Sequence, residues 1–104
     1  MSKYRNVRTT IAGEKFDSKR EALRHLVLKD MEKHGDIRSL KRQPYFKLGI
    51  NGKEICTYIG DWEYFDNRKN VYVVEDSKGV QTRDFRIKWK LCQALFPEID
   101  WRLS

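Results

Sequence analysis

The stretch Tyr58–Gly79, YIGDWEYFDNRKNVYVVEDSKG, decides the fold and contains the residues that point to a chemistry. Its two strand-like halves are joined by the short polar turn 66–70, which predicts an antiparallel pair of strands. Asp76 and Lys78 are two residues apart, so their side chains leave the same face of the second strand. Counted from the turn, Asp61 on the first strand is expected to lie near Asp76.

These residues form a candidate metal site. Two carboxylates that converge repel each other, and a divalent cation relieves that repulsion. Oxygen ligands suit Mg²⁺, which takes one or two carboxylates together with substrate phosphate. We therefore predict Mg²⁺ (or Mn²⁺) held by Asp61, Asp76 and the carbonyl of Ser77, with Lys78 beside it to orient water or stabilise charge on phosphate. The alternative is a simple ion pair between Asp76 and Lys78 at a strand end.

Two helices are predicted, one before and one after this stretch. Ser18 and Glu21 have the spacing of a capping box, which opens a helix from about 19 to 34. Its inner face is expected to consist of the apolar residues that recur at intervals of three and four: Ala22, Leu23, Leu26, Val27 and Met31. Thr82 is the predicted cap of a second helix from about 83 to 95.

The remaining segments alternate as strands do. Asn51–Gly52 is a hairpin signal, and Pro44 marks a break before it. Strands are predicted at 7–11, 37–48, 54–66, 71–78 and 99–103. The order of elements favours the α/β class in an α+β layout, in which helices flank a mixed β-sheet core. Four aromatic residues are expected in that core: Tyr45, Tyr58, Trp62 and Trp89.

Length, composition and charge exclude several classes of protein. The 104 residues allow one domain, 1–104, and 3 Trp, 5 Tyr and 5 Phe suffice for a core. The net charge of 22 − 15 = +7 favours a polyanionic partner. No apolar run approaches the ~18 residues of a membrane span, so no membrane partner is expected. Cys56 and Cys92 lack the CxxC spacing of zinc sites and are expected to be reduced, as in the cytoplasm.

Beyond these patterns, four sequence blocks in chain order resemble a known enzyme superfamily. They are KFDSKREA (15–22), YIGD (58–61), VEDSKG (74–79) and TRDFRIK (82–88). The arrangement Asp-x14-Asp-x-Lys resembles the PD-(D/E)XK nucleases, and the four blocks resemble a small, mostly phage- and prophage-encoded family within them, distantly similar to Holliday-junction resolvases. The resemblance covers residues 4–103. One departure is that Gly60, and not proline, precedes Asp61.

The resemblance implies a restriction-endonuclease-like fold and Mg²⁺-dependent hydrolysis of DNA phosphodiesters. Glu21 would match the acidic residue of the first helix and reach the metal directly or through water. Asp61 and Asp76 would match the metal ligands, and Lys78 the catalytic lysine. The implied substrate is a branched or structured DNA. The implied location is the cytoplasm of a phage-infected or lysogenic bacterial cell, and the implied partners are phage or host recombination proteins.

Basic residues beside these motifs suit a track for DNA phosphates. The candidates are Arg20, Arg24, Arg83, Arg86 and Lys88, although each alone is equally typical of a solvated surface. The resemblance adds Gln43, since related nucleases often place a polar residue on the strand before the catalytic one. Thr82 is either only a helix cap or also a phosphate contact at the helix N-terminus.

Three hypotheses remain open from the sequence. The first is a small endonuclease, expected as a homodimer because cutting both strands of a duplex requires two sites. The second is a non-catalytic DNA-binding module with the same fold. The third is a nuclease subunit that needs a partner for activity.

Overall fold

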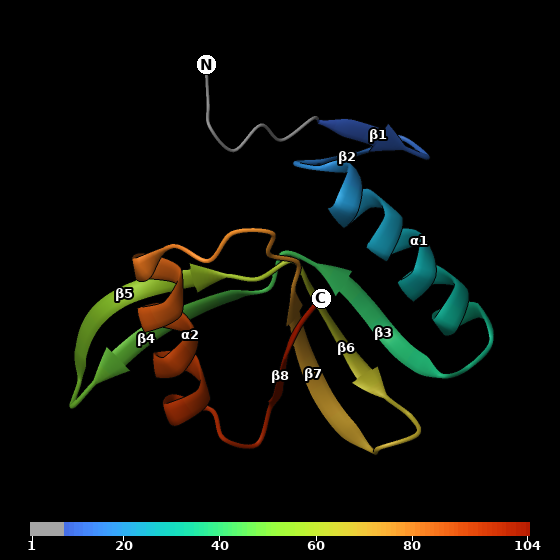
Figure 1. Cartoon of the computed structure of the whole chain (residues 1–104). Coiled ribbons are helices and arrows are strands. Elements are labelled where there is room, and N and C mark those ends of the chain that lie inside the picture. The colour runs from blue at the N-terminus through green and yellow to red at the C-terminus, as the bar shows by residue number, and fades with distance from the viewer. Residues whose placement is uncertain (1–7) are drawn as a thin grey trace.

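A computed structural model describes residues 8–104 as an α+β fold around one mixed sheet (Figure 1). The sheet has the order β3–β6–β7–β8, formed by Ile37–Arg42, Trp62–Asp66, Val71–Asp76 and Asp100–Leu103. The pairs β3–β6 and β6–β7 are antiparallel, and β8 runs parallel to β7. The predicted α+β layout with a mixed sheet is therefore confirmed.

Both helices begin where the sequence predicts, because their caps satisfy free backbone amides. In α1 (Lys19–Lys33), Ser18 Oγ accepts a 3.1 Å hydrogen bond from the amide of Glu21. In α2 (Arg83–Leu95), Thr82 Oγ1 accepts one of the same length from the amide of Phe85. Figure 1 shows α1 and α2 on opposite sides of the sheet.

The alternation of β7 assigns its side chains to these two sides. Val73 packs with α1 in a core that contains Leu28, Ile37, Trp62 and Tyr64. Val74 packs with α2 in a second core that contains Leu48, Tyr58, Phe85, Trp89 and Cys92. Glu75 consequently faces the α1 side and Asp76 the α2 side, so the two adjacent acids serve different neighbourhoods.

Two hairpins complete the described chain. The first pairs β1 (Thr9–Ile11) with β2 (Glu14–Phe16); Val7, the start of the strand predicted at 7–11, lies outside the described residues. The second pairs β4 (Tyr45–Ile50) with β5 (Lys53–Ile59). Its turn residues Asn51 and Gly52 have φ of 53° and 79°, as the hairpin signal predicts.

The single strand predicted over 54–66 is wrong, because the chain changes sheets at Gly60–Asp61. β5 pairs with β4, whereas β6 pairs with β3 and β7. Gly60 is buried where a Cβ atom would lie 3.2 Å from the side chains of both Pro44 and Val74, so a larger residue would have to push these side chains aside. The amide of Asp61 then donates to the carbonyl of Glu75, which joins the junction to β7.

The predicted inner face of α1 is also wrong in part. Three of the five residues, Leu23, Leu26 and Val27, are 45–52% exposed, whereas Ala22 is buried. Glu21 and His25 are buried instead, since each has polar partners on neighbouring elements that offset its desolvation. The spacing of apolar residues along a helix does not show which polar residues will find hydrogen-bond partners in the interior.

Two further expectations can be checked against burial. Tyr58, Trp62 and Trp89 are buried as predicted. Tyr45 is 56% exposed, because it pairs with Ile59 on the outer face of the β4–β5 hairpin. Within residues 8–104, neither helix has the length and apolarity needed to cross a membrane.

Candidate active site

Half of the predicted site residues line one pocket of about 440 Å³. It lies between the start of α1, the junction after β5, the end of β7 and the cap of α2. Its lining consists of Asp17, Ser18, Arg20, Glu21, Asp61, Ser77, Lys78, Gly79, Val80 and Thr82. Six residues singled out from the sequence are therefore brought together by four separate elements.

Asp61 is held rigidly by its own backbone and by that of Ser77. Its amide donates to the carbonyl of Glu75 at 3.1 Å, and its carbonyl accepts from the amide of Gln43 at 2.9 Å. Its carboxylate oxygen Oδ2 accepts a 2.7 Å hydrogen bond from the amide of Ser77. Burial and the nearby carboxylate of Asp76 raise the pKa of Asp61 to about 8, although the Ser77 amide acts in the opposite direction.

Asp76 lies behind the pocket wall, with only 1% of its surface exposed. Its Oδ2 atom accepts a very short hydrogen bond from the hydroxyl of Tyr58. Its Oδ1 atom has no hydrogen-bond partner and is 3.5 Å from Nζ of Lys78. The predicted proximity of Asp76 to Asp61 is confirmed, since the carboxylate of Asp76 lies close enough to raise the pKa of Asp61.

Lys78 reaches from the end of β7 over the ring of Phe85. Its Nζ atom is 4.9 Å from the ring centroid, which is within the range of a cation–π contact. The side chain remains 36% exposed, so the ammonium faces both Asp76 and the pocket. Phe85 is the first buried residue of α2, and its ring therefore sets where the lysine lies.

The donor atoms at this site fit a hard divalent cation. Two atoms in the same stretch of chain, Oδ1 of Asp76 and Oγ of Ser77, are buried without a hydrogen-bond partner. A buried polar atom without a partner costs roughly 1–3 kcal/mol, which a bound cation or its water would offset. The mutual repulsion of Asp61 and Asp76 would be relieved in the same way. Oxygen donors of this kind suit Mg²⁺ or Mn²⁺.

Glu21 lines the pocket, but its carboxylate is used by protein groups. Oε1 accepts from the guanidinium of Arg42 at 3.4 Å, and Oε2 accepts from the amide of Asp17 at 3.3 Å. Across residues 8–104, no three His, Cys, Asp or Glu side chains cluster closely enough to form a preassembled metal site. Glu21 therefore lies within electrostatic reach of Asp61 but is not gathered with the aspartates as a third ligand.

The predicted DNA contacts divide into three groups. Arg20 and Thr82 line the pocket. The Nη2 atom of Arg20 also donates a 2.7 Å hydrogen bond to the carbonyl of Ser104. Arg83 and Arg86 are exposed on the first turns of α2, and Lys88 is half-buried farther along the helix. Gln43 is exposed at the turn between β3 and β4, where its φ is 57°, and it supports Asp61 through its backbone.

Arg24 does not belong to that exposed set. Its guanidinium binds both oxygens of the fully buried Glu75, at 2.6 and 2.9 Å. Tyr64 donates a third hydrogen bond to Glu75, at 2.6 Å. Burial alone would raise the pKa of Glu75, but the hydrogen bonds from Arg24 and Tyr64 outweigh it and lower the pKa. Arg24 thus neutralises a buried carboxylate on the α1 side of the sheet.

The sequence did not single out Tyr58 and Phe85 as site residues. Tyr58 was expected only in the apolar core, and both residues are buried there. What distinguishes them is that each also touches a site residue, Tyr58 through Asp76 and Phe85 through Lys78. The sequence signal for each was its place in a block of the resemblance, Tyr58 in YIGD and Phe85 in TRDFRIK.

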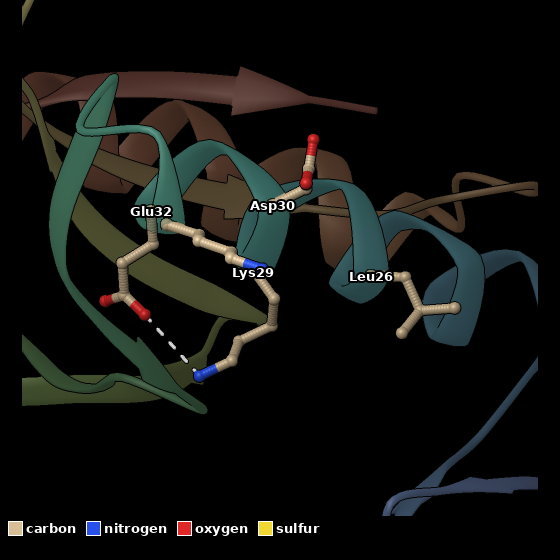
Figure 2. A pocket seen from close by; sticks show the side chains of 5 residues that line it. Leu26, Lys29, Asp30 and Glu32 are labelled. Atoms are coloured by element: carbon tan, nitrogen blue, oxygen red, sulfur yellow. Dashed lines mark hydrogen bonds and ion pairs between the residues drawn. The ribbon is translucent and has the colours of Figure 1, made fainter.

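A second hollow, of about 400 Å³, lies on the outer surface of α1 (Figure 2). All of its lining residues belong to that one helix: Leu26, Lys29, Asp30, Glu32 and Lys33. Lys29 and Glu32 pair with each other at 3.5 Å, as the dashed line in Figure 2 marks. These are charged residues on the exposed surface of one helix, where ion pairs are common and contribute little. We therefore do not consider this hollow a candidate site.

Comparison with known proteins gives one match. No curated protein and no solved structure is significantly similar to the chain. Residues 1–104 match the family described as "Protein of unknown function (DUF1064)". The chain therefore belongs to the DUF1064 family.

Proposed function

We propose that this chain is a DNA endonuclease that hydrolyses phosphodiester bonds with Mg²⁺ or Mn²⁺ as cofactor. The observation that carries the proposal is a pocket lined by Asp61 and Lys78 with Asp76 directly behind its wall, where Oδ1 of Asp76 is buried and without a hydrogen-bond partner. The ion pair with Lys78 leaves that oxygen without a hydrogen bond, and it does not account for a second buried carboxylate beside it.

Each residue has a definable role in this proposal. Asp61 and Asp76 would hold the cation, with Ser77 contributing an oxygen from the adjacent position. A cation bound there supplies Lewis acidity, which stabilises negative charge on the phosphate. Lys78 would orient the attacking water and stabilise charge in the transition state, because its ammonium is both exposed to the pocket and fixed in place.

The DNA would be held at the rim of the pocket. Arg20 and Thr82 line it, while Arg83 and Arg86 extend the positive surface along α2. This arrangement provides phosphate contacts and no element suited to reading bases, so recognition by shape, such as that of a branched DNA, is the preferred form. A bacterial cytoplasm, recombination proteins as partners and a homodimer belong to the same proposal.

A cleavage assay tests the proposal directly. The purified chain would be incubated with supercoiled plasmid and with a synthetic four-way junction, in Mg²⁺, Mn²⁺ or EDTA. Asp61→Asn should lower the cleavage rate at least about 100-fold, since it removes a negative charge that would hold the cation. Asparagine keeps an oxygen that can accept the Ser77 amide, so the local fold should persist. Asp36→Asn, which alters an ion pair with Arg68, is the matched control and should cut normally.

The opposite outcome has a clear meaning. Binding to DNA without cleavage in any metal would favour the non-catalytic module or the subunit that needs a partner. One observation favours these two alternatives over a self-sufficient nuclease. In the part of the chain that the structure describes, no three metal-ligating side chains are preassembled. Adding candidate recombination proteins would then distinguish a partner-dependent nuclease from a binding module.

A further inference from the structure

Tyr58 makes a contact that its place in the core does not require. It lies near the end of β5, is 3% exposed, and packs in the core beneath α2. Its hydroxyl nevertheless donates to Oδ2 of Asp76, on a neighbouring sheet. Phenylalanine would fill the same apolar space, so the hydroxyl is needed only for this hydrogen bond.

The hydrogen bond distinguishes the two oxygens of Asp76. Oδ2 is occupied by the Tyr58 hydroxyl, whereas Oδ1 lacks a hydrogen bond and lies 3.5 Å from Nζ of Lys78. With one oxygen fixed, rotation of the carboxylate about its Cβ–Cγ bond is restricted. The free oxygen is therefore presented toward the lysine and the pocket side of the strand.

The ring that bears this hydroxyl is itself held in place. The centroid of Tyr58 lies 6.0 Å from that of Trp89 and 6.1 Å from that of Trp101, both edge-to-face. The Phe85 ring lies 6.5 Å away and in turn contacts Lys78. The same aromatic cluster thus fixes Asp76 through one member and Lys78 through another.

A second tyrosine–carboxylate pair in this chain provides a comparison. Tyr64 donates to Oε1 of Glu75 on the opposite face of β7, but Arg24 also binds both oxygens of that carboxylate. Glu75 is therefore saturated and has no free oxygen. Of these two pairs, only the one on the α2 side leaves a buried carboxylate oxygen without a hydrogen bond.

We infer that Tyr58 is a positioning residue for the proposed metal site, one that holds Asp76 so that Oδ1 is free to coordinate a divalent cation. The inference rests on the proposed function and extends it to a residue outside the ligand set. Groups that orient metal ligands through hydrogen bonds typically change metal affinity about 10- to 100-fold when they are removed.

The test is the affinity of the metal-free protein for Mn²⁺, measured by calorimetry and by the electron paramagnetic resonance of free Mn²⁺. Tyr58→Phe should weaken binding about tenfold or more while near-ultraviolet circular dichroism shows an intact fold. Tyr64→Phe removes an equivalent buried hydroxyl from Glu75 and should leave the Mn²⁺ affinity unchanged. Asp61→Asn, tested alongside, identifies the binding as that of this site.

The outcomes separate the inference from the proposed function. Equal Mn²⁺ affinities of the wild-type protein and Tyr58→Phe would overturn the inference and leave the nuclease proposal standing. A wild-type protein that neither binds Mn²⁺ nor cuts DNA would overturn both. If Tyr58→Phe does not fold, proton NMR of the wild-type protein replaces it: the Tyr58 hydroxyl resonance should be visible and should shift when Mg²⁺ saturates the site, and an unshifted resonance would overturn the inference.

Discussion

The backbone amide of Ser77 donates a 2.7 Å hydrogen bond to Oδ2 of Asp61, which joins the end of β7 to the junction between β5 and β6. Together with the bond from the Asp61 amide to the Glu75 carbonyl, it brings together the two parts of the chain on which the site depends. It also partly stabilises a carboxylate that burial and Asp76 otherwise disfavour. The contribution of Asp61 to the free energy of unfolding should consequently depend on pH and on bound cations.

The first prediction concerns the pH dependence of stability without metal. The pKa of Asp61 is raised from 3.8 to about 8 in the fold, so between these values the folded state keeps a proton that the unfolded state releases. The contribution of Asp61 is fully present below pH 3.8 and is lost as the pH rises through 8, with a slope of up to about 1.4 kcal/mol per pH unit. Urea unfolding in EDTA at several pH values would measure it.

The matched comparison is Asp61→Asn, which has no proton to release. The difference in unfolding free energy between the two proteins isolates Asp61 from other titrating groups such as His25, whose pKa is lowered by burial. Asp61→Asn should gain stability relative to the wild-type protein as the pH rises from 4 to 8. A difference that stays constant over this range would show that the two aspartates do not interact as described.

The second prediction assigns Arg24 to stability. Arg24→Ala leaves the fully buried Glu75 without its guanidinium and should destabilise the fold by about 3 kcal/mol in urea unfolding. Arg68→Ala is the control, since Arg68 is 78% exposed in its pair with Asp36 and should cost less than about 1 kcal/mol. Similar losses in the two variants would contradict a buried structural role for Arg24.

The third prediction concerns the contact between Phe85 and Lys78. Phe85→Leu removes a cation–π contact worth about 0.5–1 kcal/mol, so the single-turnover cleavage rate should fall about two- to fivefold. In a Lys78→Met background the same substitution should have no effect on the residual rate, because there is no ammonium to position. Equal effects in both backgrounds would mean that Phe85 acts only through packing.

Much of the fold could be predicted because its signals are local. Each of these signals depends on residues that are close together in the sequence. They are the helix caps Ser18 and Thr82 and the turn at Asn51–Gly52. The change of sheet at Gly60 could not be predicted in this way. It depends on contacts with Pro44 and Val74, which are distant in sequence, and an alternating pattern continues across it unchanged.

The same distinction applies to the site. Asp61, Asp76 and Lys78 follow from strand pairing and from the resemblance to known nucleases, and the structure brings them together. The use of Arg24 by Glu75 was missed, because the sequence shows only an exposed-looking basic residue on a helix. A long-range partner of this kind is fixed by tertiary packing and leaves no spacing pattern.

The last prediction tests the proposed DNA track on α2. Arg83 and Arg86 are exposed on the first turns of the helix whose cap, Thr82, lines the pocket. Each phosphate that an arginine neutralises contributes about 0.9 to the slope of log affinity against log salt. Arg83→Ala and Arg86→Ala should therefore each reduce the steepness of that slope by about 0.9 in fluorescence anisotropy titrations.

Lys53→Ala is the matched control, since Lys53 lies at the start of β5, roughly 20 Å along the strand from the end that leads to Asp61. A reduction as large for Lys53 as for the arginines would show that the net charge of +7, and not a defined track, attracts the DNA.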